Sequence, residues 1–253
     1  MIKPNQEGFT ILELLIASMV FSVIFLGATT AIIQVGKLYY KGVVTGRTQE
    51  TVRALTDSVT QQLQFGSGNG NIPAVAGDTP VTIQYYANNI SSGGTNISFY
   101  AYCLGTTRYT FVLNGQVNSS ILDARYDPDN FRLQHALWRD SVANGSGASC
   151  VPANLTEKNP SLLAGGTNGK EMLGENMRLT KFDLLCNAVS NVCNFDLRVI
   201  YGDNDLMIPI PDSNTVPTGP DATNIPTKCG AIIGSQWCAM SELKTTVLRR
   251  VGV

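Results

Sequence analysis

The side chain with the clearest chemical potential is Glu13, a carboxylate at the start of a long apolar segment. A charged group at the edge of an apolar helix is costly in a membrane, and such residues usually have a specific partner. If a peptidase cuts the chain after Gly8, Phe9 acquires a free α-amine and Glu13 becomes the fifth residue. The amine and the carboxylate then lie at nearly the same depth, about one helical turn apart. Between neighbouring subunits, such a pair could neutralise both charges and set the axial register of packed helices.

The segment that follows, residues 14–35, contains no charged residue. A helix needs ~20 apolar residues to cross the bilayer core, and it satisfies its own backbone hydrogen bonds there. A cleaved secretory signal fits less well, because its apolar region is shorter and ends at a small-residue cleavage site. An uncleaved anchor of an unrelated protein is the second alternative.

The run Gly-Phe-Thr-Ile-Leu-Glu-Leu that begins at Gly8, with the apolar helix after it, resembles the processing site of the type IV pilin-like superfamily. In that family a membrane-embedded aspartyl peptidase removes the leader after the glycine, and the new amine is N-methylated. The resemblance implies cleavage between Gly8 and Phe9, methylation of Phe9, and Glu13 as the assembly carboxylate. It also implies the partners: the prepilin peptidase, and other pilins or pseudopilins bound through the N-terminal helix.

Looser similarities point to a narrower branch, the larger minor pilins and the J-type minor pseudopilins of type II secretion. Those proteins tend to have a Tyr/Leu-rich strand ending in Arg, a strand after a Leu-x-Glu-Asn-like turn, and a final strand ending in basic residues. The corresponding segments are residues 133–139, 173–177 and 245–250. The family often has a proline midway along the transmembrane helix, where this chain has Thr29 and Thr30. The helix conformation in a filament therefore stays open.

Composition favours an exported structural protein. The 253 residues, about 245 after removal of the leader, leave room for one sizeable domain beyond the anchor. The formal net charge of -1 argues against a general nucleic-acid-binding surface, which would be strongly basic. Charged residues make up only 15%, which favours a loop-rich β domain. Lys3 is the only basic residue before the helix, so the positive-inside rule gives only weak support for the orientation of the helix in a membrane.

All six cysteines lie beyond the anchor, an even number that suits disulfides in an oxidising compartment. Fifteen pairings are possible, but two pairs are close in sequence, which favours local staples and leaves the other two cysteines for each other. A metal site is the weaker alternative, because no Cys-x-x-Cys is present. The local pairs are Cys186 with Cys193 and Cys229 with Cys238, and the remaining pair is Cys103 with Cys150.

No motif supports an enzyme, a resident metal or a cofactor. A Ser-His-Asp triad or a His-paired cysteine would have to use His135, the only histidine, which has no nucleophile motif nearby. A structural histidine is the better interpretation. Asp203 and Asp205 are weak Ca²⁺ candidates, as are residues 127–130, but both stretches are ordinary turn sequences.

The elements that position this chemistry begin with one long helix. No proline interrupts residues 9–64, so a continuous helix would be roughly 84 Å long at ~1.5 Å per residue. Three glycines within residues 36–46 could allow bending at the junction. Apolar residues then recur at three- and four-residue steps, which predicts a face buried against the domain. They are Val52, Leu55, Val59 and Leu63.

Beyond the helix, alternating patterns predict an antiparallel sheet, and a sheet packed on a long helix is an α+β, pilin-like architecture. We expect a turn at residues 88–94, a β-hairpin at Asn114-Gly115 and a long loop at residues 207–228. Trp138, Trp237 and the tyrosines are expected in the core, and a recognition patch is the weaker alternative. The predicted strands are residues 81–85, 97–102, 109–113, 131–133 with 136–139, 172–177, 181–185, 194–201 and 245–250.

These features predict a leader at residues 1–8, a transmembrane and assembly helix at 9–35, an amphipathic half at 36–65 and a disulfide-containing β-rich domain at 66–253. The resemblance implies a non-enzymatic minor pilin or pseudopilin that initiates or caps a type IV pilus (a fimbrium) or a type II secretion filament. It would wait in the inner membrane with a periplasmic domain, then join a filament in the periplasm or on the cell surface. The alternative is a pilus-tip binding module that recognises a surface, glycan or DNA; an anchored exported enzyme is the third and weakest possibility.

Overall fold

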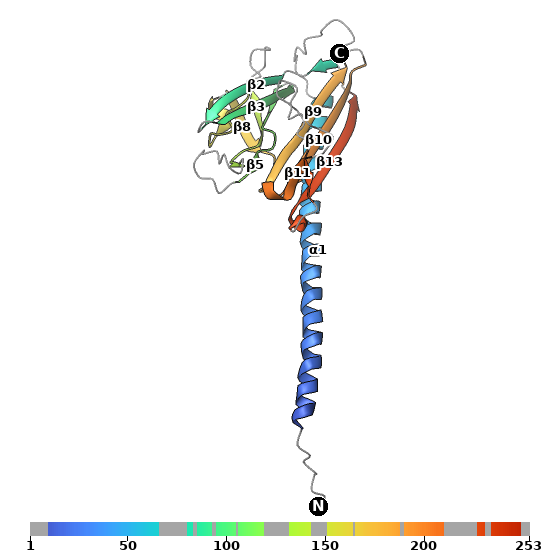
Figure 1. Cartoon of the computed structure of the whole chain (residues 1–253). Helices are drawn as coiled ribbons and strands as arrows, with labels where there is room; N and C mark the ends of the chain where they lie inside the picture. Colours follow the sequence, from blue (N-terminus) through green and yellow to red (C-terminus); the bar gives the residue numbers. More distant parts are fainter. Residues whose placement is uncertain are drawn as a thin grey trace, which may run out of the picture.

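The computed structural model describes residues 10–65, 80–82, 85–92, 95–104, 106–118, 132–142, 151–163, 165–187, 190–209, 227–230 and 234–248. One long helix, α1 (Ile11–Phe65), projects far beyond a β-rich domain (Figure 1). At ~1.5 Å per residue, α1 is about 82 Å long, which confirms the predicted continuous helix. The glycines within residues 36–46 do not interrupt it.

The second half of α1 packs on the domain through one stripe of side chains. The predicted apolar stripe is confirmed, since all four of its residues are almost fully buried. Thr48 and Thr56 are buried in the same stripe, and each hydroxyl donates a 2.8 Å hydrogen bond to the carbonyl four residues earlier. This backbone bond satisfies the hydroxyl and allows a polar side chain to be buried on a helix face. The buried residues of α1 are Val44, Thr48, Val52, Leu55, Thr56, Val59 and Leu63.

The strands form two main sheets. The larger has the order β13-β10-β9-β5-β6, with β1 also paired to β9, and only the β5–β6 pair is parallel among these described pairings. The second has the antiparallel order β2-β3-β4-β7-β8, and β11 pairs with β12 separately. The bounds of the larger sheet are β1 Pro80–Thr82, β5 Gln116–Val117, β6 Arg132–Leu133, β9 Met177–Asn187, β10 Val192–Tyr201 and β13 Ala239–Leu248. The others are β2 Tyr85–Ser92, β3 Thr95–Leu104, β4 Thr107–Phe111, β7 Leu137–Val142, β8 Gly166–Glu171, β11 Met207–Pro209 and β12 Thr227–Cys229, with short helices α2 Pro160–Leu163, η1 Asn204–Leu206 and η2 Ser235–Trp237.

Two turn predictions were wrong. The expected turn at residues 88–94 is largely strand, because β2 pairs with β3 along its whole length, up to Ser92 opposite Thr95. β2 lies at the edge of its sheet, where backbone pairing tolerates a polar sequence. Asn114 does adopt a left-handed φ of 64°, but no hairpin follows. Both edges of β4 are already paired, to β3 and β7, so β5 joins the other sheet instead.

Three further segments differ from the expectation. Residues 172–176 form a loop between β8 and β9 rather than a strand, and Asn176 takes a left-handed φ of 60° there. The segments expected at residues 131–133 and 136–139 contribute to two different sheets: residues 132–133 form β6 and residues 137–142 form β7, while residue 131 lies outside the described residues. The expected loop at residues 207–228 begins and ends in paired strands, β11 and β12, and its middle lies outside the described residues.

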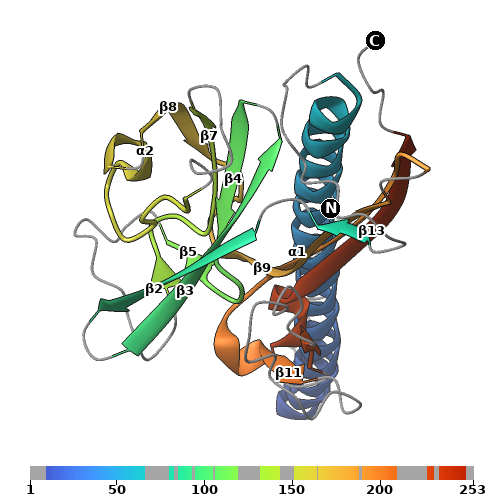
Figure 2. The ribbon, with the colours of Figure 1, turned by 90° about the horizontal axis from the view of Figure 1, so that it is seen from above.

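The core lies where α1 and both sheets meet. Seen along the helix in Figure 2, β13 crosses one side of α1 and β4 lies on the other. Phe182 of β9 is central, with its ring centroid 4.8 Å from that of Phe111 and 5.4 Å from that of Phe195. Ser58 of α1 lies within hydrogen-bonding distance, 3.0 Å, of the Tyr109 hydroxyl. The second half of α1 is therefore an integral part of the domain.

Covalent and ionic links join neighbouring strands. Cys186–Cys193 joins β9 to β10, and Cys229–Cys238 joins β12 to the residue before β13. Cys103 is also disulfide-bonded, whereas Cys150 lies outside the described residues. Between β4 and β7, the fully buried side chains of Arg108 and Asp140 form an ion pair, with Nε donating to Oδ1 at 2.9 Å.

Candidate functional site

The N-terminus of α1 is closed by a reciprocal pair of side chains, Thr10 and Glu13. The Thr10 backbone N–H and hydroxyl both donate to Glu13 Oε2, at 3.2 and 3.1 Å. In return the Glu13 N–H donates to Thr10 Oγ1 at 3.3 Å. This is a capping box, in which a Thr and a Glu three residues later satisfy backbone donors that the first helical turn leaves open. The helix dipole also favours a negative charge in this turn.

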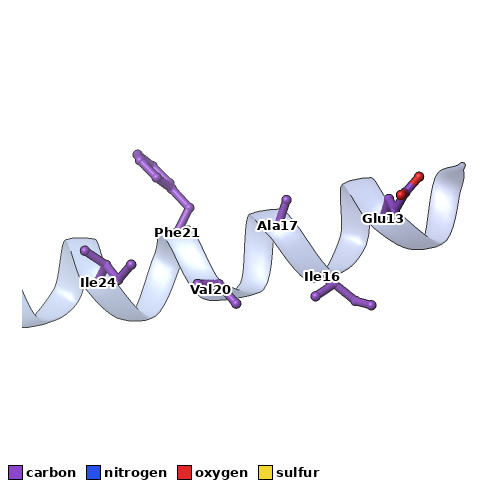
Figure 3. A pocket seen from close by; sticks show the side chains of 6 residues that line it. All are labelled: Glu13, Ile16, Ala17, Val20, Phe21 and Ile24. Atoms are coloured by element: carbon purple, nitrogen blue, oxygen red, sulfur yellow. The ribbon is translucent and has the colours of Figure 1, made fainter. Parts of the chain in front are cut away.

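The same carboxylate lies at the end of a shallow, open groove along α1. Its lining residues recur at three- and four-residue steps, which places them on one side of the helix. Figure 3 shows the small side chain of Ala17 between Glu13 and Phe21, so that a hollow lies beside the carboxylate. An open apolar groove with one acid fits another apolar helix better than a small molecule, whose sites are enclosed. The lining residues are Glu13, Ile16, Ala17, Val20, Phe21 and Ile24.

This half of α1 is long and apolar enough to cross a membrane, with a mean hydropathy of 2.4 in its most apolar window. None of this stretch is buried by the parts of the chain that the structure describes. Ile11 and Leu12 are 82% and 68% exposed, and the apolar side chains remain exposed as far as Tyr39. Such a surface is apolar around the whole helix, which is typical of a segment that lies in lipid or among other helices. The first half of α1 is thus consistent with membrane anchoring.

The structure describes only part of the expected processing site. Gly8 and Phe9 lie outside the described residues, so their roles in cleavage and methylation stay predictions. Glu13 is described, and it lies exposed at the helix end within one turn of the predicted new N-terminus. Its role in assembly also stays a prediction. The capping box was missed from the sequence, although its signal, Thr-x-x-Glu before an apolar run, was present.

The other candidate residues from the sequence, His135 and Asp203, contact neighbouring side chains of the domain. The His135 ring packs edge-on against Trp138, with centroids 4.6 Å apart, and its Nδ1 lies 3.5 Å from Glu171 Oε2. Asp203 Oδ1 accepts hydrogen bonds from Arg132 at 3.2 Å and from Gln116 at 3.0 Å. These donors occupy one of the two carboxylate oxygens that a Ca²⁺ ion could use.

Asp205 is exposed, and residues 127–130 lie outside the described part of the chain. Within the described ranges, no group of three or more His, Cys, Asp or Glu side chains could hold a metal ion.

A comparison with protein families agrees with this geometry. The family model of the prokaryotic N-terminal methylation motif matches residues 3–29, a span that includes Glu13 and the groove. That motif supports the type IV pilin-like superfamily. No curated protein and no solved structure matches the chain. The pilin-like match covers the N-terminal segment and leaves the globular domain unmatched, and the family that it indicates is structural rather than enzymatic.

Proposed function

We propose that this chain is a minor pilin or pseudopilin of a type IV pilus or a type II secretion filament. Residues 1–8 are a leader, 9–35 an anchoring and assembly helix, 36–65 the part of the helix that builds the domain, and 66–253 the globular domain. The observation that carries the proposal is the N-terminal methylation motif on a helix whose first half is apolar and exposed on every side. The domain faces the periplasm, an oxidising compartment that suits its disulfides.

In the proposed mechanism, Glu13 lies first beside the N-terminal amine of its own chain and then pairs with the amine of a neighbouring subunit. Cleavage between Gly8 and Phe9 exposes the cationic α-amine of Phe9 beside a carboxylate at the membrane edge, and a methyl donor then methylates that amine in a separate step. Assembly brings the amine of one subunit to Glu13 of its neighbour, while the apolar helices pack side by side. Neutralising two charges in an apolar setting makes the pairing strong and fixes the register between subunits.

The size of the globular domain supports a minor role, in which the subunit starts or caps the filament rather than forms its bulk. Deletion of the chain tests this role. Loss of filaments supports initiation, whereas normal filaments that no longer adhere would favour a tip-binding module instead.

Processing is tested by N-terminal sequencing and intact mass of the protein extracted from membranes. We expect a chain that begins at Phe9 and carries one added methyl group. A peptidase-deficient strain is the control, and there the chain should still begin at Met1. A mature chain that starts at any residue other than Phe9 in the wild-type strain would overturn the proposal.

A further inference from the structure

The apolar run of α1 ends in a ring of aromatic and basic residues. Lys37 is the first charged residue after Glu13, and Tyr39, Tyr40 and Lys41 follow within about one turn. Successive helix positions turn by about 100°, so these side chains point around the helix in several directions. From Glu13 to Tyr40 the helix rises about 40 Å, close to the ~40–45 Å of a bilayer with its headgroups. The ring therefore lies one membrane thickness from the carboxylate.

The globular domain reaches α1 at the same level. Trp237 of η2 packs against Tyr40 with ring centroids 3.9 Å apart, and it remains 44% exposed. Tyr201 lies beside Tyr40, and burial together with the neighbouring Tyr40 hydroxyl raises the pKa of Tyr201. In Figure 1, the start of β13, which follows Trp237, lies at the end of the domain nearest the free half of α1. The expectation that Trp237 lies in the core was therefore wrong.

Two features hold Trp237 at this surface. Cys238, the next residue, is disulfide-bonded to Cys229. Gly234 opens the turn with a left-handed φ of 98°, and an added Cβ would lie 3.1 Å from Leu206. A residue with a side chain would be unfavourable there for two reasons: the left-handed backbone conformation, and the close contact of its Cβ with Leu206. The turn thus presents an exposed indole from a fixed backbone.

We propose that this end of the domain, with the aromatic and basic ring of α1, lies in the lipid headgroup layer before assembly. Trp and Tyr rings favour that layer because one end is apolar and the other polar. Lys37 and Lys41 are exposed and extend into it, where they attract anionic lipid. The surface continues directly from the membrane-spanning helix, so lipid, rather than a second protein, is the occupant that fits. The inference rests on the proposed membrane anchoring.

The chain allows a direct test because it has only two tryptophans, and Trp138 is 6% exposed. The full chain is reconstituted at low protein density in vesicles of phosphatidylcholine with phosphatidylglycerol, and lipids spin-labelled near the headgroup serve as quenchers. The difference in fluorescence between wild type and Trp237→Phe isolates Trp237. The Phe variant keeps an aromatic ring against Tyr40, so the fold is preserved. We expect strong quenching of the Trp237 component by headgroup-labelled lipid and weak quenching by iodide in the water.

The lysines are tested by Lys37→Gln/Lys41→Gln, with Lys158→Gln/Lys170→Gln as a control of equal charge change at exposed positions of the domain. Each lysine near an anionic surface contributes about 1 kcal/mol to lipid binding, which is roughly fivefold in the equilibrium constant. In anionic vesicles, Lys37→Gln/Lys41→Gln should therefore weaken the equilibrium for contact with the headgroups roughly fivefold per lysine, and Lys158→Gln/Lys170→Gln should leave it unchanged.

Three results would overturn the inference. Quenching of Trp237 by iodide but not by lipid would place the domain away from the membrane. Protection from both quenchers would mean that a second copy of the chain covers the tryptophan. A chain that fails to float with the vesicles would overturn the membrane anchoring as well, which separates failure of the proposed function from failure of this inference alone.

Discussion

The role of Glu13 can be separated into a charge and a helix cap. Glu13→Gln keeps the size of the side chain and an oxygen that accepts from Thr10, because Gln also serves in a capping box. It removes only the negative charge. Glu13→Ala removes both the charge and the cap. Thr10→Ala removes half of the cap and keeps the charge.

The expected magnitudes differ enough to decide between the two roles. A pair of unit charges about 4 Å apart is worth about 4 kcal/mol at an effective dielectric constant near 20. That corresponds to roughly a thousandfold in the equilibrium between paired and unpaired subunits. Loss of an N-cap costs about 1 kcal/mol, or roughly fivefold. The charge should therefore outweigh the cap in assembly.

The assay measures the fraction of the subunit in sheared filaments against the fraction left in the membrane, with N-terminal sequencing to check processing. We expect Glu13→Gln and Glu13→Ala to be cleaved normally and to fail in incorporation to a similar degree. Thr10→Ala should incorporate at close to the wild-type level.

Efficient incorporation of Glu13→Gln would refute the pairing of charges. If Glu13→Gln assembles and Glu13→Ala does not, the cap rather than the charge is the contribution of this residue. A failure of Thr10→Ala as severe as that of Glu13→Gln would lead to the same conclusion.

Three further predictions concern the domain, each measured by denaturant unfolding of the full chain in detergent. Asp140→Ala removes the carboxylate that neutralises the buried Arg108 guanidinium and should cost about 3–5 kcal/mol, whereas Asp203→Ala, which breaks a more exposed pair, should cost about 1 kcal/mol or less. Leu55→Ala should cost about 2–5 kcal/mol, and the exposed Arg53→Ala, two residues earlier and facing away from the domain, about 0.5 kcal/mol or less. Burial raises the pKa of Glu242, but the hydrogen bonds and charges of its basic neighbours hold the pKa below its ordinary value overall. The ionised Glu242 side chain therefore adds to the free energy of unfolding at neutral pH, and this contribution is lost as the pH falls through the lowered pKa. Glu242→Gln should make the free energy of unfolding depend less on pH on the acid side. An unchanged profile, or equal costs within either matched pair, would contradict the corresponding contact.

The features of α1 could be predicted from sequence because they are local. An uncharged run of sufficient length predicts a helix that is long and apolar enough to cross a membrane, and a stripe at 3.6-residue spacing identifies a buried face, as at Val52 and Val59. The capping box at Thr10 is equally local, and it was missed because Glu13 was interpreted only as a partner for another subunit. One residue can hold both roles in succession.

The arrangement of strands could not be predicted in the same way, because it depends on competition between distant segments. Asn114-Gly115 is a strong hairpin signal, yet the neighbouring edges of β4 are already occupied by β3 and β7. The exposure of Trp237 is also a matter of distant contacts. Its position follows from the disulfide between Cys229 and Cys238 and from the arrival of η2 beside Tyr40.

The two halves of α1 thus have different environments, and the boundary between them lies near Tyr40. Before it, apolar side chains point in every direction, and nothing in the described part of the chain covers them. After it, from Val44 to Leu63, the large apolar side chains lie on one face and the domain buries them. An all-round apolar helix of this length is stable only in lipid or among other helices, whereas a striped helix needs only its own domain. The chain can therefore bury its apolar side chains at one end of α1 and leave them exposed at the other, and this exposed half is the surface that the proposed function places first in a membrane and then in an assembly.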